Sequence, residues 1–269
     1  MTAVHRCPLV VVTETEGPGA RLAERLAAAG VRVWSFPVVA HEPVGDAGPL
    51  DAALERLEDY VWVVFTSVRA VEAVCTRDLW NRWPWAEGKH PWIAAVGPVT
   101  AGALRQRGLV VRQTPAAPGA AGLARALADA EGGDLAGRRI LWPRSDIARD
   151  ELRDTLAAAG AVVVDPVAYR TVARRPVDAE GCARAIAAGA IDAVTFLSPS
   201  SAVNFAAALG EPSLACLNGR TIVASVGPTT SAALADLGAP PAIEAPDRTT
   251  TGLVAALLAR FGLRDGAAG

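Results

Sequence analysis

The stretch Val96-Gly97-Pro98-Val99-Thr100-Ala101 decides the fold, because it recurs 130 residues later as Val226-Gly227-Pro228-Thr229-Thr230-Ser231. In each copy a short apolar run comes before the Gly-Pro pair, and alanine and leucine follow at helical spacing. Proline is favoured in the first turn of a helix, where its missing N–H costs nothing. Each copy therefore predicts a buried strand that turns sharply into a helix.

Three more matches show that the repeat extends over the whole chain. Leu26–Gly30 matches Leu156–Gly160, and Gly122-Leu123 matches Gly252-Leu253, both at a spacing of 130 residues. Val64–Ser67 resembles Thr195–Ser198 at a spacing of 131. Four matches in one order indicate a tandem duplication, and the period has the length of a domain rather than of a solenoid repeat.

Each half alternates short β-rich runs with segments of helical periodicity. The predicted strands are Leu9–Thr13, Val31–Phe36, Val61–Phe65, Trp92–Val96, Leu109–Arg112, Arg139–Trp142, Ala161–Val164, Ala193–Leu197, Thr221–Ser225 and Ala242–Glu244. Gly30 and Gly160 stand where helix C-caps belong. Alternating strands and helices predict parallel sheets with helices on both faces, so we expect an α/β protein of two similar domains.

Composition excludes several classes of function. The 26 basic and 28 acidic side chains give a net charge of −2, so we expect no nucleic acid and no membrane as partner. The cysteines and histidines are scattered without ligand spacing, so we expect neither a zinc site nor a disulfide framework. The first apolar run, from Cys7 to Val12, is too short and too soon followed by Glu14 for a signal peptide. We therefore expect a cytoplasmic protein.

Hydroxyl side chains and two arginines gather where the predicted strands end. They are Thr66, Ser67, Arg69, Thr100, Arg144, Ser198, Ser200, Thr229 and Thr230. In open α/β sheets ligands bind at this edge, where helix N-termini present free N–H groups. Serine and threonine are also ordinary helix N-caps, and that reading stays open for each of them. Their recurrence in both halves predicts a site for a large anion with several carboxylates. Glycine-rich nucleotide motifs are absent from the sequence, so we expect no cofactor.

The same residues carry a family resemblance. Phe65-Thr66-Ser67 with Arg69, Val96-Gly97-Pro98 with Thr100, and Trp142-Pro143-Arg144-Ser145 resemble the first three signatures of uroporphyrinogen-III synthases. Val167–Thr171, around Tyr169, resembles the family's interdomain tyrosine segment, and Ser198-Pro199-Ser200 and Val226–Thr230 complete the set. The motifs cover nearly the whole chain, from about residue 8 to residue 262. Two positions depart from the family pattern: Glu14 replaces a common arginine, and Leu197 a common hydroxyl residue. Trp80 to Trp92 is expected to be a surface loop.

The resemblance implies a discontinuous first domain. The first strand–helix unit would join the C-terminal half, giving domain 1 as residues 1–38 and 172–269 and domain 2 as residues 39–171. Two extended segments, near Val38–His41 and Tyr169–Val172, would link the domains across a cleft.

The resemblance also implies an activity. The substrate would be hydroxymethylbilane, a linear tetrapyrrole with eight carboxylates, and the product uroporphyrinogen III. Loss of water would give an azafulvene, and a spiro intermediate would fragment and reclose with the terminal ring inverted. The enzyme would be a cofactor-free hydro-lyase of tetrapyrrole and haem biosynthesis, acting as a monomer. Tyr169 would be its catalytic residue, and the hydroxyls and arginines at the strand ends its substrate contacts.

Alternatives remain open at this stage. The chain is also compatible with a hinged small-molecule-binding protein, or with a regulatory synthase-like module without activity. Tyr169 is equally well explained as a packing residue of the linking strand, and Arg144 as half of a surface ion pair.

Overall fold

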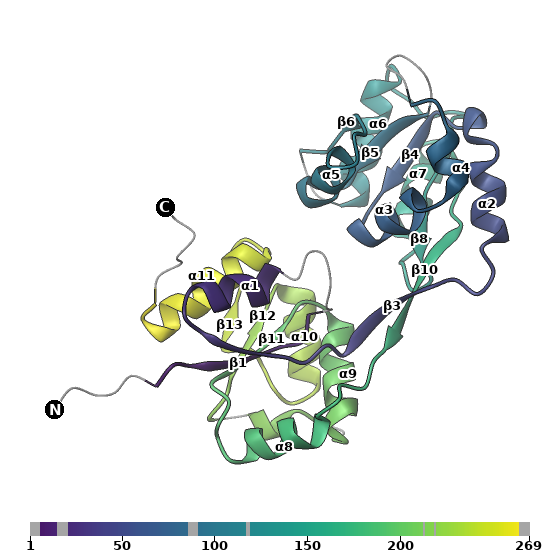
Figure 1. Cartoon of the computed structure of the whole chain (residues 1–269). Helices are drawn as coiled ribbons and strands as arrows, with labels where there is room; N and C mark the ends of the chain where they lie inside the picture. The colour runs from purple at the N-terminus through teal and green to yellow at the C-terminus, as the bar shows by residue number, and fades with distance from the viewer. Residues whose placement is uncertain are drawn as a thin grey trace. The chain divides into compact units, whose positions relative to one another are not determined.

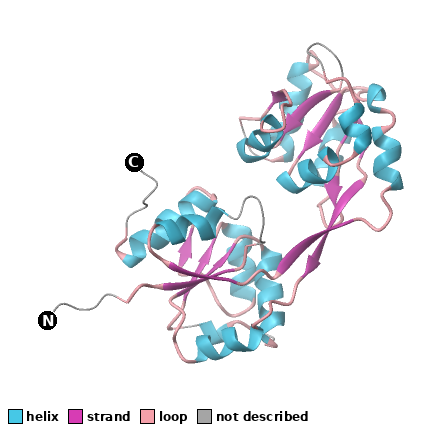
Figure 2. Ribbon diagram, viewed as in Figure 1, coloured by secondary structure: helices cyan, strands magenta, loops and turns pink. Residues whose placement is uncertain are grey.

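The computed structural model describes residues 6–14, 21–85, 91–116, 119–211, 213–217 and 219–263. The chain divides into two compact units, shown in Figure 1: unit 1 is made of residues 1–40 and 172–269, and unit 2 of residues 41–171. Each is a parallel sheet with helices on both faces, as Figure 2 shows, so the predicted fold class is confirmed.

Unit 1 has a five-stranded sheet in the order β13-β12-β11-β1-β2. Its elements are β1 (Leu9–Val12), α1 (Arg21–Ala28), β2 (Arg32–Ser35), α8 (Ala179–Ala187), β11 (Ala193–Phe196), α9 (Pro199–Leu209), η2 (Ala215–Leu217), β12 (Ile222–Ser225), α10 (Pro228–Asp236), β13 (Ile243–Glu244) and α11 (Thr250–Phe261). The central pair is β1 with β11, in which Val10 lies opposite Ala193. The first strand thus pairs with one that follows it by more than 180 residues.

Unit 2 has a sheet of the same plan, in the order β6-β5-β4-β7-β9. Its elements are α2 (Gly48–Leu54), η1 (Leu57–Asp59), β4 (Trp62–Phe65), α3 (Val68–Cys75), α4 (Asp78–Arg82), β5 (Trp92–Ala95), α5 (Pro98–Arg105), β6 (Val111–Gln113), α6 (Ala120–Ala130), β7 (Arg139–Leu141), α7 (Glu151–Ala158) and β9 (Val162–Val164). Strands β4, β5 and β6 occupy the places of β11, β12 and β13, so the sequence repeat is a repeat of sheet topology.

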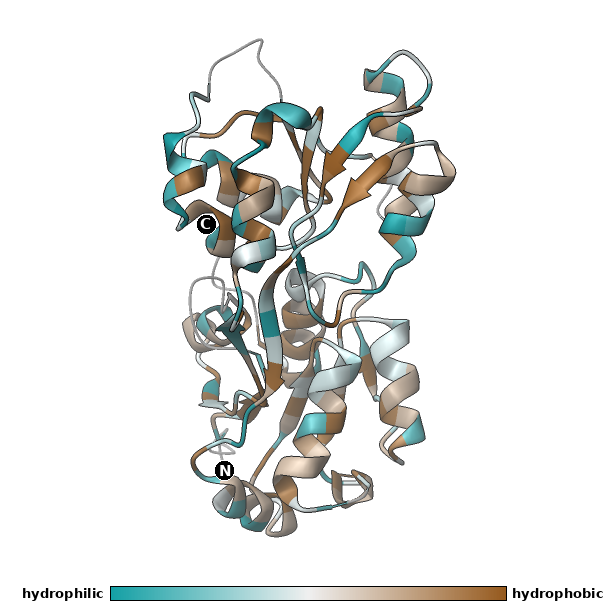
Figure 3. Cartoon of the chain, turned by 90° about the vertical axis from the view of Figure 1, so that its right-hand side faces the viewer, coloured by the Kyte–Doolittle hydropathy of each residue, from teal (hydrophilic) through white to brown (hydrophobic). Residues whose placement is uncertain are grey.

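Helices bury the apolar residues on both sides of each sheet. In unit 2, Val71 and Leu104 pack on one face, and Leu123 and Leu156 on the other. In unit 1, α8, α9 and α10 cover one face, while α1 and α11 cover the other. The central strands β4 and β11 are buried along their whole length, which explains why they are continuous apolar runs rather than alternating ones. Figure 3 shows strands of both units coloured as hydrophobic.

A third sheet has three strands, and two of them contain the positions where the chain passes from one unit to the other. It consists of β3 (Val39–Pro43), β10 (Val167–Ala173) and the short β8 (Arg144–Ser145), in the order β3-β10-β8. The two longer strands fall on the segments expected to be extended. Strand β8 was not predicted, because two residues carry no periodicity.

The segment that begins at Trp80 differs from expectation. Trp80 ends up 2% exposed in the core of unit 2, with its ring edge-on to Phe65 at 5.6 Å and tilted against Trp85 at 4.2 Å. The surface-loop interpretation of this stretch is therefore wrong for its first residues, because a five-residue helix, α4, turns the tryptophan inward. Residues 86–90 lie outside the described part of the chain.

Candidate functional site

Each sheet reverses its strand order at one place. Some of the predicted hydroxyl residues follow the strands that meet at this place. The chain runs outward from β11 to β13 on one side and from β1 to β2 on the other, so the switch point of unit 1 lies between β1 and β11. In unit 2 it lies between β4 and β7. Ligands of open α/β sheets bind beyond the strand ends at such points.

In unit 2 the switch point brings together three predicted residues. Ser67 caps α3 by accepting a hydrogen bond from Ala70 N–H at 3.0 Å, and its hydroxyl lies 3.1 Å from that of Tyr169. Thr66 accepts a hydrogen bond at 3.2 Å from Nε1 of Trp142, which follows β7. The Tyr169 phenol is therefore fixed by hydrogen bonding as well as by packing.

His41 holds the other side of Tyr169, and sequence reasoning missed it. Its ring meets the tyrosine ring edge-on, with centroids 5.4 Å apart and an interplanar angle of 82°. Its Nδ1 lies 3.3 Å from the Thr171 hydroxyl, which lies 2.9 Å from that of Ser145. The available signal was that His41 lies in a segment expected to be extended, because an extended segment pairs with another strand and its side chains then contact those of that strand.

The polarity of this chain of hydrogen bonds follows from its last member. Ser145 donates to Asp146 Oδ1 at 3.1 Å, and Thr171 N–H donates to the same oxygen at 2.8 Å. Because an ionised carboxylate only accepts, Thr171 must donate to Ser145, and His41 must donate from Nδ1 to Thr171. The imidazole is then held with its proton on Nδ1.

The electrostatics fit a neutral imidazole. Burial, followed by the positive charge of Arg69, lowers the pKa of His41 below its ordinary 6.5, against the opposing effects of Glu72 and Asp146. Burial alone would raise the pKa of Asp146, but hydrogen bonds from Thr171, Ser145 and Ile147, together with Arg170, bring that pKa below its usual value.

The two Gly-Pro turns give the same arrangement in both units. Helices α5 and α10 start at Gly97 and Gly227, which have no side chain to cap the first N–H groups. Thr100 and Thr230 are 5% and 3% exposed. Within the part of the chain that the structure describes, neither threonine hydroxyl makes a hydrogen bond. Neither oxygen is among the buried unpaired side-chain atoms of the described residues, so both hydroxyls reach the surface and are available to a ligand.

Unit 1 has serine hydroxyls at its switch point. Ser198 caps α9 in a reciprocal pair with Ser201, and its hydroxyl lies 3.0 Å from that of Ser200. Thr229 is exposed in the first turn of α10. Leu197 stands where unit 2 has Thr66, which removes one hydroxyl from this edge.

The two predicted arginines are both engaged within unit 2. Arg69 pairs with Glu72 at 2.8 Å on the same helix. Arg144 is 16% exposed, pairs with Asp165 at 2.9 Å, and donates to the Ala148 carbonyl at 3.0 Å. These contacts fit the ion-pair interpretation that the sequence left open for Arg144.

Two general features accompany the site. Among the described residues, no group of three or more His, Cys, Asp or Glu side chains could hold a metal ion. Within the same ranges, every helix is too short or too polar to cross a bilayer.

Comparison with known proteins decides the family. The family model described as uroporphyrinogen-III synthase HemD matches residues 20–255. A uroporphyrinogen-III synthase of Synechococcus elongatus is 30% identical over 255 residues, which cover 92% of this chain and 93% of that protein. The chain belongs to the uroporphyrinogen-III synthase family. The predictions of a uroporphyrinogen-III synthase and of a hydro-lyase are thereby confirmed.

Other members of the uroporphyrinogen-III synthase family are also similar to this chain. The enzyme of Chlorobaculum parvum is 25% identical and covers 85% of this chain and 89% of its own length. Two solved structures share the fold. A mutant synthase of the extremely thermophilic bacterium Thermus thermophilus has a TM-score of 0.57 at 21% identity, covering 95% of this chain and 98% of its own. The Helicobacter pylori synthase has a TM-score of 0.59 at 15% identity, with coverages of 94% and 99%.

Proposed function

We propose that this protein converts hydroxymethylbilane into uroporphyrinogen III, and that the paired Gly-Pro turns receive the substrate's carboxylates. The carrying observation is that Thr100 and Thr230, at equivalent places in a duplicated fold, are held in the core while their hydroxyls make no hydrogen bond with any described residue and are not sealed off from the surface. Family membership supplies the reaction, and this pair supplies a reason for its anionic substrate.

The helix starts favour carboxylates for two reasons. The first N–H groups of α5 and α10 point out of the helix, and the helix dipole adds a partial positive charge there. Pro98 and Pro228 have no N–H, and Thr230 N–H donates to the Gly227 carbonyl at 3.0 Å. The N–H groups left to a ligand are therefore those of Val99 and Thr100 in α5 and of Thr229 in α10. Ser67 and Ser198, by contrast, each accept from an N–H of the helix that they cap, α3 and α9. Each unit thus pairs one closed helix start with one open start, and the threonine adds a hydroxyl donor to the open one.

Tyr169 is the group that we assign to the leaving hydroxyl. Its phenol can donate a hydrogen bond to the departing oxygen while Ser67 and His41 keep the ring in place. Departure of water leaves an azafulvene cation, which the electron-rich pyrroles stabilise. The protein then needs only to hold the terminal ring where its substituted carbon can attack, which is catalysis by positioning.

The remaining predicted contacts have graded roles in this proposal. Ser198, Ser200 and Thr229 offer hydroxyls at the unit 1 edge, and Thr66 with Ser67 at the unit 2 edge. Arg69 already pairs with Glu72, so a substrate carboxylate would have to share the guanidinium with that side chain. Arg144 orders the turn after β7 through Asp165, and we assign it to the architecture of the edge.

We further propose that the protein acts as a monomer in the cytoplasm. The cysteines at positions 7, 75, 182 and 216 are free thiols, as in a reducing compartment. Light scattering after gel filtration should give the mass of one 27.7 kDa chain, and cell fractionation should place the protein in the cytoplasmic fraction.

The deciding experiment is an isomer assay. Freshly made hydroxymethylbilane is added to the protein without metal or nucleotide, and the oxidised products are resolved into type I and type III isomers. The proposal expects mainly type III, with no effect of a chelator. Type I alone, the product of uncatalysed closure, would favour the non-catalytic binding or regulatory module.

A further inference from the structure

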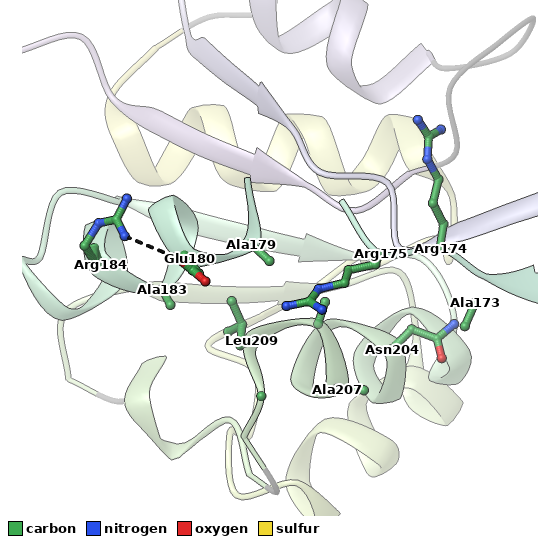
Figure 4. Close-up of a pocket in the computed structure, with 12 residues that line it drawn as sticks. Ala173, Arg174, Arg175, Ala179, Glu180, Ala183, Arg184, Asn204, Ala207 and Leu209 are labelled. Carbon is green, nitrogen blue, oxygen red and sulfur yellow. Dashed lines mark ion pairs between the residues drawn. The ribbon is translucent and has the colours of Figure 1, made fainter. Parts of the chain in front are cut away.

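A groove lies in unit 1 away from the strand ends that form the proposed site. It runs between α8 and α9 beside the segment that follows β10, and its volume is about 820 Å³. Figure 4 shows small side chains around the groove, among them Ala179, Ala183 and Ala207, with Leu209 between them. The size is that of a site for a small organic ligand rather than for a simple ion.

The duplication places a counterpart in unit 2. That groove, of about 360 Å³, lies between the end of β3, α2 and α3. Its charges are matched: Arg69 pairs with Glu72, and Arg77 forms a double hydrogen bond with Asp51, one arm of it 2.8 Å long. The polar side chains of this groove therefore stabilise one another.

The unit 1 groove lacks that matching. Arg175 makes no hydrogen bond or ion pair with any residue that the structure describes. Figure 4 shows its side chain lying across the groove, while Arg174 turns the other way. Arg184 approaches Glu180 only to 3.8 Å, with both side chains more than 70% exposed, so this pair is weak. Arg175 and Arg184 thus give the groove positive charge on a protein whose net charge is −2.

We propose that this groove is a second binding site, for a flat aromatic ring compound whose edge carries carboxylates, such as a tetrapyrrole. Alanine side chains let a flat ring approach the helices α8 and α9 closely. A planar guanidinium binds carboxylates in two-point fashion and stacks on aromatic faces, which suits Arg175 lying across the ring. Arg184 would take a carboxylate at the opposite side of the groove.

The proposal goes beyond the synthase reaction and uses none of its residues. The groove is lined by the helix α8 and the last half of α9, whereas the proposed reaction uses the helix starts at the strand ends. Occupancy of the groove would let the chain sense a tetrapyrrole without competition at the reacting residues.

The test is a binding titration of the full chain with uroporphyrin III, the oxidised and stable form of the product. Equilibrium dialysis should give two sites per chain in the wild type. The double variant Arg175→Ala/Arg184→Ala should lose one site or weaken it by at least about tenfold, since each lost charged hydrogen bond costs that much. Isomer formation from hydroxymethylbilane should be unchanged in this variant.

Matched controls separate the alternatives. Arg56→Ala removes an exposed arginine of unit 2 and should leave both sites intact. One site in the wild type, or two sites that persist in the double variant, would overturn the proposal while leaving the synthase activity standing. Competition at equal strength by a poly-glutamate peptide or by inorganic phosphate would also overturn it, because the groove would then select charge alone.

Discussion

The two units share one sheet topology but differ in what their polar residues contact. Unit 2 places an aromatic phenol, an imidazole and paired arginines around its switch point, and nearly every one of these groups bonds to another group of the same unit. Unit 1 places serine and threonine hydroxyls at its strand ends and leaves Arg175 unpaired within the described residues. The two edges are equivalent in topology, and among the described residues the phenol held by hydrogen bonding lies at the edge of unit 2.

This difference teaches how a neutral protein can serve a substrate with eight carboxylates. In the proposed function, the elements that bind the anions are repeated backbone features, the helix starts of α5 and α10. In the same proposal, elements that differ between the halves, such as Tyr169, supply selectivity and chemistry.

The largest expected effect concerns the separate cores. Six of the seven tryptophans belong to unit 2, and Trp34 alone to unit 1, so tryptophan fluorescence reports mainly on unit 2. Trp80→Ala removes a buried ring and should destabilise unit 2 by about 3–5 kcal/mol. Phe205→Ala leaves a cavity in the core of unit 1 between Phe36 and Phe196, and it should destabilise unit 1 by a similar free energy.

Denaturant unfolding followed by fluorescence and by circular dichroism checks this. Trp80→Ala should move the fluorescence transition, whereas Phe205→Ala should move a circular dichroism transition and leave most of the fluorescence change in place. Coincident transitions in both variants would mean that the units unfold as one.

Tyr169→Phe should reduce turnover by about a hundredfold, the lower end of the range for a positioned proton donor. The ring contact with His41 persists in this variant, so the fold should be retained. Product binding should weaken much less, because the product has lost the oxygen that the phenol serves. Stopped-flow turnover and product titration give the two numbers, and an unaffected rate would leave Tyr169 as a packing residue.

Thr230→Ala should lower kcat/KM by about ten- to a hundredfold, the worth of one hydrogen bond to a charged group. Thr100→Ala, its counterpart, should lose a comparable factor, and the two losses should multiply in the double variant. Thr230→Ser keeps the hydroxyl and should stay close to wild type. If Thr100→Ala left kcat/KM unchanged, the two duplicated turns would not both bind the substrate.

The smallest expected effect is a pH dependence. Because the pKa of His41 is lowered by folding, the unfolded chain binds more protons than the folded chain in the interval just below 6.5. The stability of unit 2 should therefore be fully developed above about pH 6.5 and fall as the pH drops below it. His41→Gln should flatten this part of the profile, measured as the wild-type minus variant difference in unfolding midpoint. An unchanged profile would contradict the neutral, Nδ1-protonated assignment.

The sequence predicted the elements better than the contacts between them. All ten expected strands are present, because apolar runs such as Val61–Phe65 are local signals. Gly30 and Gly160 have φ of 81° and 87°, as C-cap glycines require. The bond of Tyr169 to Ser67 joins residues 102 positions apart, and that of Thr171 to His41 joins residues 130 apart. Such contacts depend on how β3 and β10 pair, which no local pattern encodes.

The candidate site shows the same limit. The motif spacing identified Thr100 and Thr230 as residues at strand ends, but that their hydroxyls lack partners is a property of the folded surroundings. Arg144 looked equally suited to a ligand or to an ion pair until Asp165, from the turn after β9, came within 2.9 Å of it. Arg175, which is unpaired among the described residues, belongs to none of the sequence motifs.

The order of strands in unit 1 has a consequence for synthesis on the ribosome. Strand β1 is an interior strand of its sheet, yet its neighbour β11 is translated about 160 residues after β2 is complete. At roughly 5–20 residues per second, β1 and β2 wait on the order of ten to thirty seconds for that partner. Unit 2, made of one continuous segment, is finished first and can fold during the wait. The nascent N-terminus therefore carries an apolar strand pair with an open edge, which makes it a natural target for a chaperone that shields exposed strand edges.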